Sequence, residues 1–231
     1  MNSMSRICFC AVWPIAAASL VFGGELDLKS VDASRYRSQE YLVELRRTFD
    51  LNDESVSRQL LERARKPLTP YYRMKLATVL TANDTRGLLW VLNALHEDNV
   101  ALKGNLAQAL VHSEYREAVE VLVLLLEDTR SVPVTKIRGP KWEPPPPHFV
   151  DYRVCDLALT NLLQILGRVA HIPRKTRREY DVNRSNPLAH RDRRLAAFLD
   201  MWEIQGADIL ASMNALTTEI LRKSNTKRVS E

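Results

Sequence analysis

The sequence predicts an all-helical fold, and three observations carry that prediction. Only seven of the 231 residues are glycine, while leucine and alanine recur through the middle of the chain; this composition favours helices over a turn-rich β fold. From about residue 34 onward, apolar residues return with the period of an amphipathic helix. Short polar segments separate these runs, so neighbouring helices are expected to pack antiparallel. We therefore predict an all-α domain over residues 24–223, built from eight or nine helices.

The first three expected helices carry start and stop signals. A first helix over about residues 34–50 has an apolar stripe along one face. Asp53 can cap the second helix with its carboxylate, and Pro67 ends that helix because its ring cannot continue one. Thr69 and Pro70 restart the chain as a third helix, since proline is favoured at the first helical position.

Three more helices are expected before residue 128. Asp84 is predicted to cap the fourth helix, and Asp98 to begin the fifth. Each of the three carries a leucine- or valine-rich stripe that should face a shared core. The stripe of the fourth helix consists of Leu88, Leu89, Leu92 and Leu95. That of the fifth consists of Leu102, Leu106 and Leu110, and that of the sixth consists of Val119, Leu122, Val123 and Leu126.

Two long segments interrupt the helical pattern and are predicted to be loops. Residues 129–150 contain four consecutive prolines at 144–147, which favour an extended polyproline II conformation. Residues 168–187 form a basic segment. Two final helices, followed by a polar tail over 224–231, are expected to cover the open end of the helical array. Their apolar stripes are Leu195, Phe198, Leu199 and Trp202, then Ile209, Met213, Leu216 and Ile220.

The helices also resemble one another. Residues 87–92 resemble residues 118–123 at an offset of about 31, and the apolar spacing of 102–110 returns over 154–162 at an offset of about 52. One insertion, which ends before residue 150, accounts for the difference between the two offsets.

On these residues, the stretch 84–167 resembles two HEAT-like helical pairs, the second of them split by the insertion. In HEAT repeats, an aspartate in the turn between helices lies a few residues before a basic residue. Asp98 and Lys103 match that arrangement, and Asp151 and Arg153 match it loosely. An ordinary helical bundle with similar leucine spacing is the alternative to a repeat fold.

The resemblance extends to the following segments and covers roughly residues 84–205. Residues 153–167 are similar to a recurrent second helix of bacterial HEAT-like proteins, in which a charged, tryptophan-bearing helix often follows. Residues 191–194 and Trp202 fit that helix. The resemblance implies a short HEAT-like or armadillo-type α-solenoid of antiparallel helix pairs, and it implies little about activity, because its motifs record packing positions.

The segment 1–23 differs from the rest of the chain. Arg6 is followed by an uncharged run over residues 7–22 and then by small residues at Gly23 and Gly24, which is typical of a secretory signal peptide. The run is shorter than the span of about 20 residues that crosses a bilayer. We predict cleavage near Gly23 and export to the periplasm or the extracellular space; an uncleaved anchor or a buried helix is the alternative.

Charge and cysteine content say little about the partner. Without residues 1–23 the chain has 32 basic and 28 acidic residues, a net charge of +4, so nucleic acid is not expected as a partner. Cys155 would be the only cysteine left, which excludes an internal disulfide in the mature protein.

No motif in the sequence predicts a catalytic, cofactor-binding or metal-ligating residue. The five histidines are never three to five residues apart, and the chain has no HExxH motif, no paired cysteines, no glycine-rich phosphate loop and no GxSxG motif. Cys155 lies in a strongly apolar helix, where it is expected to be a small core residue. We therefore expect a noncatalytic protein without a cofactor, although an unrecognised active site remains an alternative.

The proline-rich insertion holds the first pair of candidate partner-binding residues. Trp142 and Phe149 flank the four prolines. They could present a proline-rich ligand to an aromatic groove of a partner, or they could anchor a stiff spacer onto their own domain. We favour the anchored spacer.

The basic segment holds the other candidates, which are Arg174, Lys175, Arg177 and Arg178. These side chains could attract phosphates or an acidic partner, or they could belong to a solvated loop. The leading prediction is an exported scaffold that holds a protein partner in the groove of a helical repeat. The alternative is an accessory or regulatory subunit that binds an anionic polymer or an acidic partner through residues 174–194.

Overall fold

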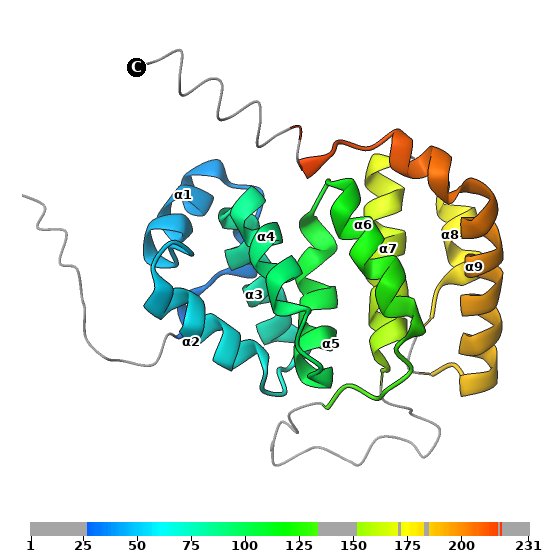
Figure 1. Ribbon diagram of the computed structural model, residues 1–231, viewed down its shortest axis with the longest axis horizontal. Helices are drawn as coiled ribbons and strands as arrows, with labels where there is room; N and C mark the ends of the chain where they lie inside the picture. The colour runs from blue at the N-terminus through cyan, green and yellow to red at the C-terminus, as the bar shows by residue number, and fades with distance from the viewer. Residues whose placement is uncertain (1–26, 134–151, 171, 183–184, 217, 219–231) are drawn as a thin grey trace, which may run out of the picture.

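The computed structural model describes residues 27–133, 152–170, 172–182, 185–216 and 218 (Figure 1). This part of the chain is all-helical, as predicted, with nine α-helices, four short 3-10 helices and no β-strand. The α-helices are α1 Gln39–Thr48, α2 Glu54–Ala64, α3 Pro70–Ala82, α4 Thr85–Ala94, α5 Val100–Ala109, α6 Arg116–Leu124, α7 Val154–Val169, α8 Arg174–Tyr180 and α9 Leu188–Ala211. The 3-10 helices are η1 Leu28–Ser30, η2 Ala33–Arg35, η3 Leu110–His112 and η4 Leu125–Glu127.

Side-chain caps fix the starts of the helices α2 and α3. The Asp53 carboxylate accepts hydrogen bonds from the backbone amides of Ser55 and Val56, and Thr69 accepts one from Tyr72, with Pro70 at the first helical position. These caps satisfy amides that have no partner within the helix. Both of these predicted helix starts are confirmed.

Three of the predicted starts were wrong, each for a local reason. The first helix begins at Gln39, because residues 33–35 form the separate turn η2. Asn99, not Asp98, caps α5, with its amide oxygen 2.9 Å from the backbone nitrogen of Leu102. Asp84 precedes α4 but makes no side-chain cap, since its backbone lies at a positive φ of 54°.

The prediction of a basic loop over 168–187 was also wrong in part. Helix α7 continues to Val169, and residues 174–180 form the helix α8, which packs against α7 and α9. The two final helices predicted from the apolar stripes are one helix of 24 residues, α9, as far as Ala211. The helix continues through Gly206, where the Trp202 ring occupies the space beside the backbone that a side chain would fill.

Most residues of the predicted apolar stripes face the core, whereas Leu89 of α4 and Leu199 of α9 are exposed. Leu102, Leu106 and Leu122 are fully buried, as predicted, and so is Leu76 of α3. On α4 the stripe turns partly outward: Leu88 is buried, but Leu89 is exposed. The core therefore follows the helices α3, α5, α6 and α7 more closely than it follows α4.

The helices recur at a nearly constant interval. Helices α2, α4 and α6 begin at positions 54, 85 and 116. Helices α1, α3 and α5 begin at positions 39, 70 and 100, so both series advance by almost the same step. Helix α3 packs against α1 and α5, α5 also packs against α7, and the helices follow one another along the long axis of the molecule (Figure 1).

Side chains one interval apart contact each other. Tyr115 donates a hydrogen bond to Asp84, 31 residues earlier, and Trp90 donates one to Ser57, 33 residues earlier. Further contacts at a separation of 32 residues join Arg65 to Glu97, Arg73 to Asn105 and Arg130 to Asp98. Several residues that lie about one interval apart in the sequence are therefore in contact in the structure.

Backbone hydrogen bonds join the described residues on the two sides of the long insertion. The backbone nitrogen of Val132 donates to the carbonyl oxygen of Tyr152 at 2.9 Å, and that of Val154 donates to Arg130 at 3.0 Å. Val132 is buried against Gly104, where a β-carbon would lie 2.6 Å from the valine methyl groups. The helical array is thus continuous across the insertion from α6 to α7.

Several predicted features lie outside the described residues. These are the segment 1–23, the candidates Trp142 and Phe149, and the tail 224–231. Within the described ranges, no helix combines the length and the apolar character needed to span a bilayer.

Candidate functional site

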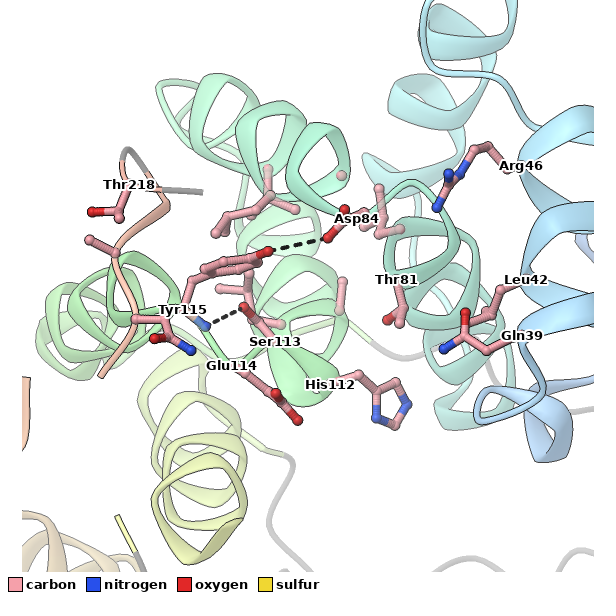
Figure 2. Close-up of a pocket in the computed structure, with 18 residues that line it drawn as sticks. Gln39, Leu42, Arg46, Thr81, Asp84, His112, Ser113, Glu114, Tyr115 and Thr218 are labelled. Carbon is pink, nitrogen blue, oxygen red and sulfur yellow. Dashed lines mark hydrogen bonds between the residues drawn. The ribbon is translucent and has the colours of Figure 1, made fainter. Parts of the chain in front are cut away.

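A groove of about 600 Å³ opens where several helix ends meet (Figure 2). Its walls come from α1, the end of α3, the start of α4, the segment 109–115 and the C-terminal residues 214, 215 and 218. Polar and apolar side chains both line it. Gln39, Arg46, Thr81, Ser113 and Glu114 supply hydrogen-bonding groups, and Leu42, Leu80, Leu88 and Val91 supply apolar surface.

The close approach of α3 and α4 shapes one wall of the groove. A β-carbon at Gly87 would lie 2.1 Å from the carbonyl oxygen of Leu80, so only glycine fits this crossing. The tight turn before α4 places Asp84 at a positive φ, and the hydroxyl of Tyr115 donates to its carboxylate at 3.3 Å (Figure 2). This contact ties the starts of α4 and α6 together.

His112 lies at the groove in an unusual electrostatic setting. Its ring stacks on Tyr36, with ring centroids 4.0 Å apart and planes 14° from parallel. Burial, together with the positive charges of Arg168 and Arg37, lowers the pKa of His112 to about 4, so the imidazole is neutral at pH 7. Its Nε2 is buried and has no hydrogen-bond partner in the described part of the chain.

The C-terminal segment docks beside α6 and completes the groove. The backbone nitrogen of Arg116 donates to the carbonyl oxygen of Asn214 at 3.0 Å, and the backbone nitrogen of Leu216 donates to the Glu117 carboxylate at 2.9 Å. Leu216 is buried. Two segments 99 residues apart in sequence are thereby joined.

A second, smaller cavity of about 220 Å³, here named the arginine cavity, collects three of the four basic candidates. Arg174, Arg177 and Arg178 of α8 line it together with Asp181 and three residues of α7, namely Thr160, Leu163 and Gln164. The fourth candidate, Lys175, is exposed on the same helix and is not among the lining residues.

Three further arginines at the start of α9, at positions 191, 193 and 194, donate to other groups of the protein. Arg191 is fully buried, and its Nη1 donates to the Asp156 carboxylate at 2.7 Å. Arg194 donates to the backbone carbonyl of Asp181, and Arg193 donates to that of Ala189. Of the described arginines in the segment 174–194, three therefore line the cavity and three make contacts within the fold.

Asp156 is the centre of a buried charge cluster that attaches α9 to α7. Arg153 donates to this carboxylate from its side chain and its backbone, while Arg191 donates to it from α9. Burial alone would raise the pKa of Asp156, but these hydrogen bonds outweigh it and lower the pKa. The carboxylate is therefore ionised inside the protein, with two guanidinium partners.

Cys155 is a core residue, as its apolar surroundings predicted. The thiol is fully buried, and burial raises its pKa to about 11. Among the described residues, no three His, Cys, Asp or Glu side chains gather in a way that could hold a metal ion.

Sequence reasoning did not find the groove residues Asp84, His112 and Tyr115 as a group. One signal was present, because the separation of Tyr115 from Asp84 equals the interval at which the helices recur. No local pattern marks His112, whose surroundings come from Tyr36, Arg37 and Arg168.

Comparison with known proteins gives no relative for this chain. It matches no protein-family model, and no match is found among curated proteins or solved structures.

Proposed function

We propose that this chain is an exported, noncatalytic interaction protein in which a short HEAT-like α-solenoid holds a segment of a protein partner. The observation that carries the proposal is the recurrence of helices at a nearly constant interval, with contacts between side chains one interval apart. Repeat proteins of this kind bury a continuous core between neighbouring units and use their extended surface for binding.

The order of helix contacts supports a solenoid. Helices α1, α3, α5 and α7 form a row in which each helix packs against the next, while α4 packs against α3 and α6 packs against α7. A closed bundle would bring the first and last helices together. Here they lie at opposite ends of the long axis (Figure 1).

The size and chemistry of the groove suit a short peptide segment. A volume of about 600 Å³ is in the range of pockets that enclose drug-sized ligands, about 300–1,000 Å³, which leaves room for a few peptide residues. Gln39, Ser113 and Asn214 offer the amide and hydroxyl groups that pair with a peptide backbone, and the neutral His112 has a ring nitrogen without a partner among the described residues. Leu42 and Leu88 offer apolar contacts for side chains.

The test is selection of peptides from a random library displayed on phage, with the purified chain as the target. Affinities of the selected peptides are then measured by calorimetry for the wild type and for variants. Glu114→Arg changes an exposed groove residue, and we expect at least tenfold weaker binding. Glu120→Arg makes the same change on the exposed side of α6, outside the groove, and should alter affinity by less than twofold.

Two results would contradict the proposal. One is failure to enrich any peptide over an unrelated helical target. The other is equal loss of affinity in both variants, which would indicate an effect of net charge. Loss of binding in a Trp142→Ser, Phe149→Ser double variant, with the Glu114→Arg variant unaffected, would place the binding site in the insertion.

A further inference from the structure

The arginine cavity carries an inference that is independent of the proposed groove. Arg174, Arg177 and Arg178 converge on a space of about 220 Å³ between α7 and α8. In the described part of the chain, none of the three forms an ion pair, although Glu179 and Asp181 are close in sequence. Three like charges held around one cavity repel one another, and a bound anion would relieve that repulsion.

Helix α7 leaves room for the Arg177 guanidinium because residue 167 is glycine. A β-carbon at Gly167 of α7 would lie 2.3 Å from Nη1 and 2.4 Å from Cζ of Arg177, so the guanidinium occupies the space that a side chain at 167 would need. The Nε of Arg177 is buried and lacks a hydrogen-bond partner in the described residues. A buried donor of this kind is stabilised by an acceptor that enters the cavity.

The lining of the cavity favours a small oxyanion over a long polymer. Guanidinium groups present planar pairs of donors that match phosphate oxygens. The exposed amide of Gln164 offers one more donor, whereas the Thr160 hydroxyl already donates to the carbonyl oxygen of Asp156 at 2.9 Å. On α9, Arg191 is buried and Arg194 donates to the carbonyl oxygen of Asp181, so Arg193 is the one exposed arginine of that helix and α9 does not form the track that a polymer needs.

We propose that the arginine cavity is a binding site for a phosphate group, either the free ion or the terminal group of a small monoester. Arg177 is the fixed donor, and Arg174 and Arg178 close on the oxyanion from the exposed side of α8. Asp181 lies at the same cavity and opposes binding through its negative charge.

Calorimetric titration with inorganic phosphate tests the proposal on the purified full chain. Saturable binding with one site per chain is expected. Arg177→Gln and Arg178→Gln should each weaken it at least tenfold. Lys175→Gln removes the same charge from the same helix outside the cavity and should change affinity less than threefold, while Asp181→Asn should tighten binding severalfold.

A variant without any change of charge makes the test specific. Gly167→Ala should weaken phosphate binding at least tenfold, because the new methyl group displaces the Arg177 guanidinium. Circular dichroism and melting curves establish that each variant is folded. If Gly167→Ala fails to fold, Arg178→Gln, at an exposed position, decides the question.

Further titrations distinguish the sources of the anion. Glycerol phosphate should bind as inorganic phosphate does, and vesicles of phosphatidylglycerol should show no binding that depends on Arg177. The proposal is overturned if inorganic phosphate does not saturate a site, or if Lys175→Gln and Arg178→Gln weaken binding equally. It is also overturned if only long polyanions or vesicles bind.

Discussion

At the scale of single residues, His112 shows how the groove differs from ordinary surface. The ring stacks on Tyr36 from the N-terminal part of the chain, while Arg168 reaches this region from α7 and donates to the carbonyl oxygen of Val111. Two cations and partial burial keep the imidazole neutral. The pH dependence of stability follows from that environment.

We expect the free energy of unfolding to fall as the pH is lowered from about 6.5 to about 4. The folded-state pKa of His112, about 4, lies below its unfolded value of 6.5, so the unfolded state takes up the proton first and is favoured in this window. Because the ring is only partly buried, we expect a loss of about 1–3 kcal/mol. Urea denaturation at pH 7 and at pH 5 measures it.

His112→Gln should reduce the difference between the two pH values, even if it lowers stability at both. His96→Gln alters an exposed histidine just after α4 and should keep the wild-type pH dependence. An unchanged pH dependence in His112→Gln would show that the titrating group lies elsewhere.

At the scale of elements, buried polar contacts decide how the last helices attach. The cluster of Arg153, Asp156 and Arg191 joins the first turn of α7 to the first turn of α9. Phe198 of α9 is also buried, and it packs edge-on against Tyr180 of α8 with ring centroids 5.7 Å apart. A buried ionic cluster and an aromatic contact thus both help to fix α9.

Asp156→Asn should be among the most destabilising single changes in the chain. It keeps the size of the side chain but leaves two buried guanidinium groups without their carboxylate, which costs about 3–5 kcal/mol. Hydrogen exchange should show the largest loss of protection in α9. Chemical denaturation gives the free energy.

Asp192→Asn is the matched control for this change. Its carboxylate also binds Arg153, at 2.6 Å, but its side chain is 57% exposed, so the expected cost is below about 1 kcal/mol. Equal costs for the two substitutions would mean that the buried cluster does not hold α9.

At the scale of the whole molecule, the stability of each helix in the row depends on the helices that pack against it. Helix α5 lies between α3 and α7 in that row, and Leu106 is fully buried within it. Because Leu106 is buried in a helix that contacts neighbours on both sides, a defect there should affect both ends of the row.

Leu106→Asp is therefore expected to abolish cooperative unfolding. Burial of an unpaired carboxylate costs several kcal/mol, comparable with the total stability of about 5–15 kcal/mol for a domain. Leu124→Asp makes the same change at a position that is 72% exposed, and it should alter stability by less than about 0.5 kcal/mol. A cooperative wild-type melting curve for Leu106→Asp would contradict the assigned core.

Local patterns in the sequence predicted the all-helical class, the starts of α2 and α3, the interval at which the helices recur and most of the buried leucines. These features depend on capping, on proline and on helical periodicity, which act within a few residues of one another. The same local rules failed at α8, whose seven residues are mostly charged and carry no apolar stripe, so that its packing against α7 and α9 is not visible in the sequence.

Contacts between side chains far apart in the sequence depend on how the helices pack. The groove joins residues near position 39 with residues near position 218, and the arginine cavity exists because α8 lies against Gly167 of α7. The packing of α9 on α7 buries Arg191 against Asp156, so this arginine is not part of the basic surface. A charge run in a sequence does not say which of its members face solvent, because that depends on the packing of helices far apart in the chain.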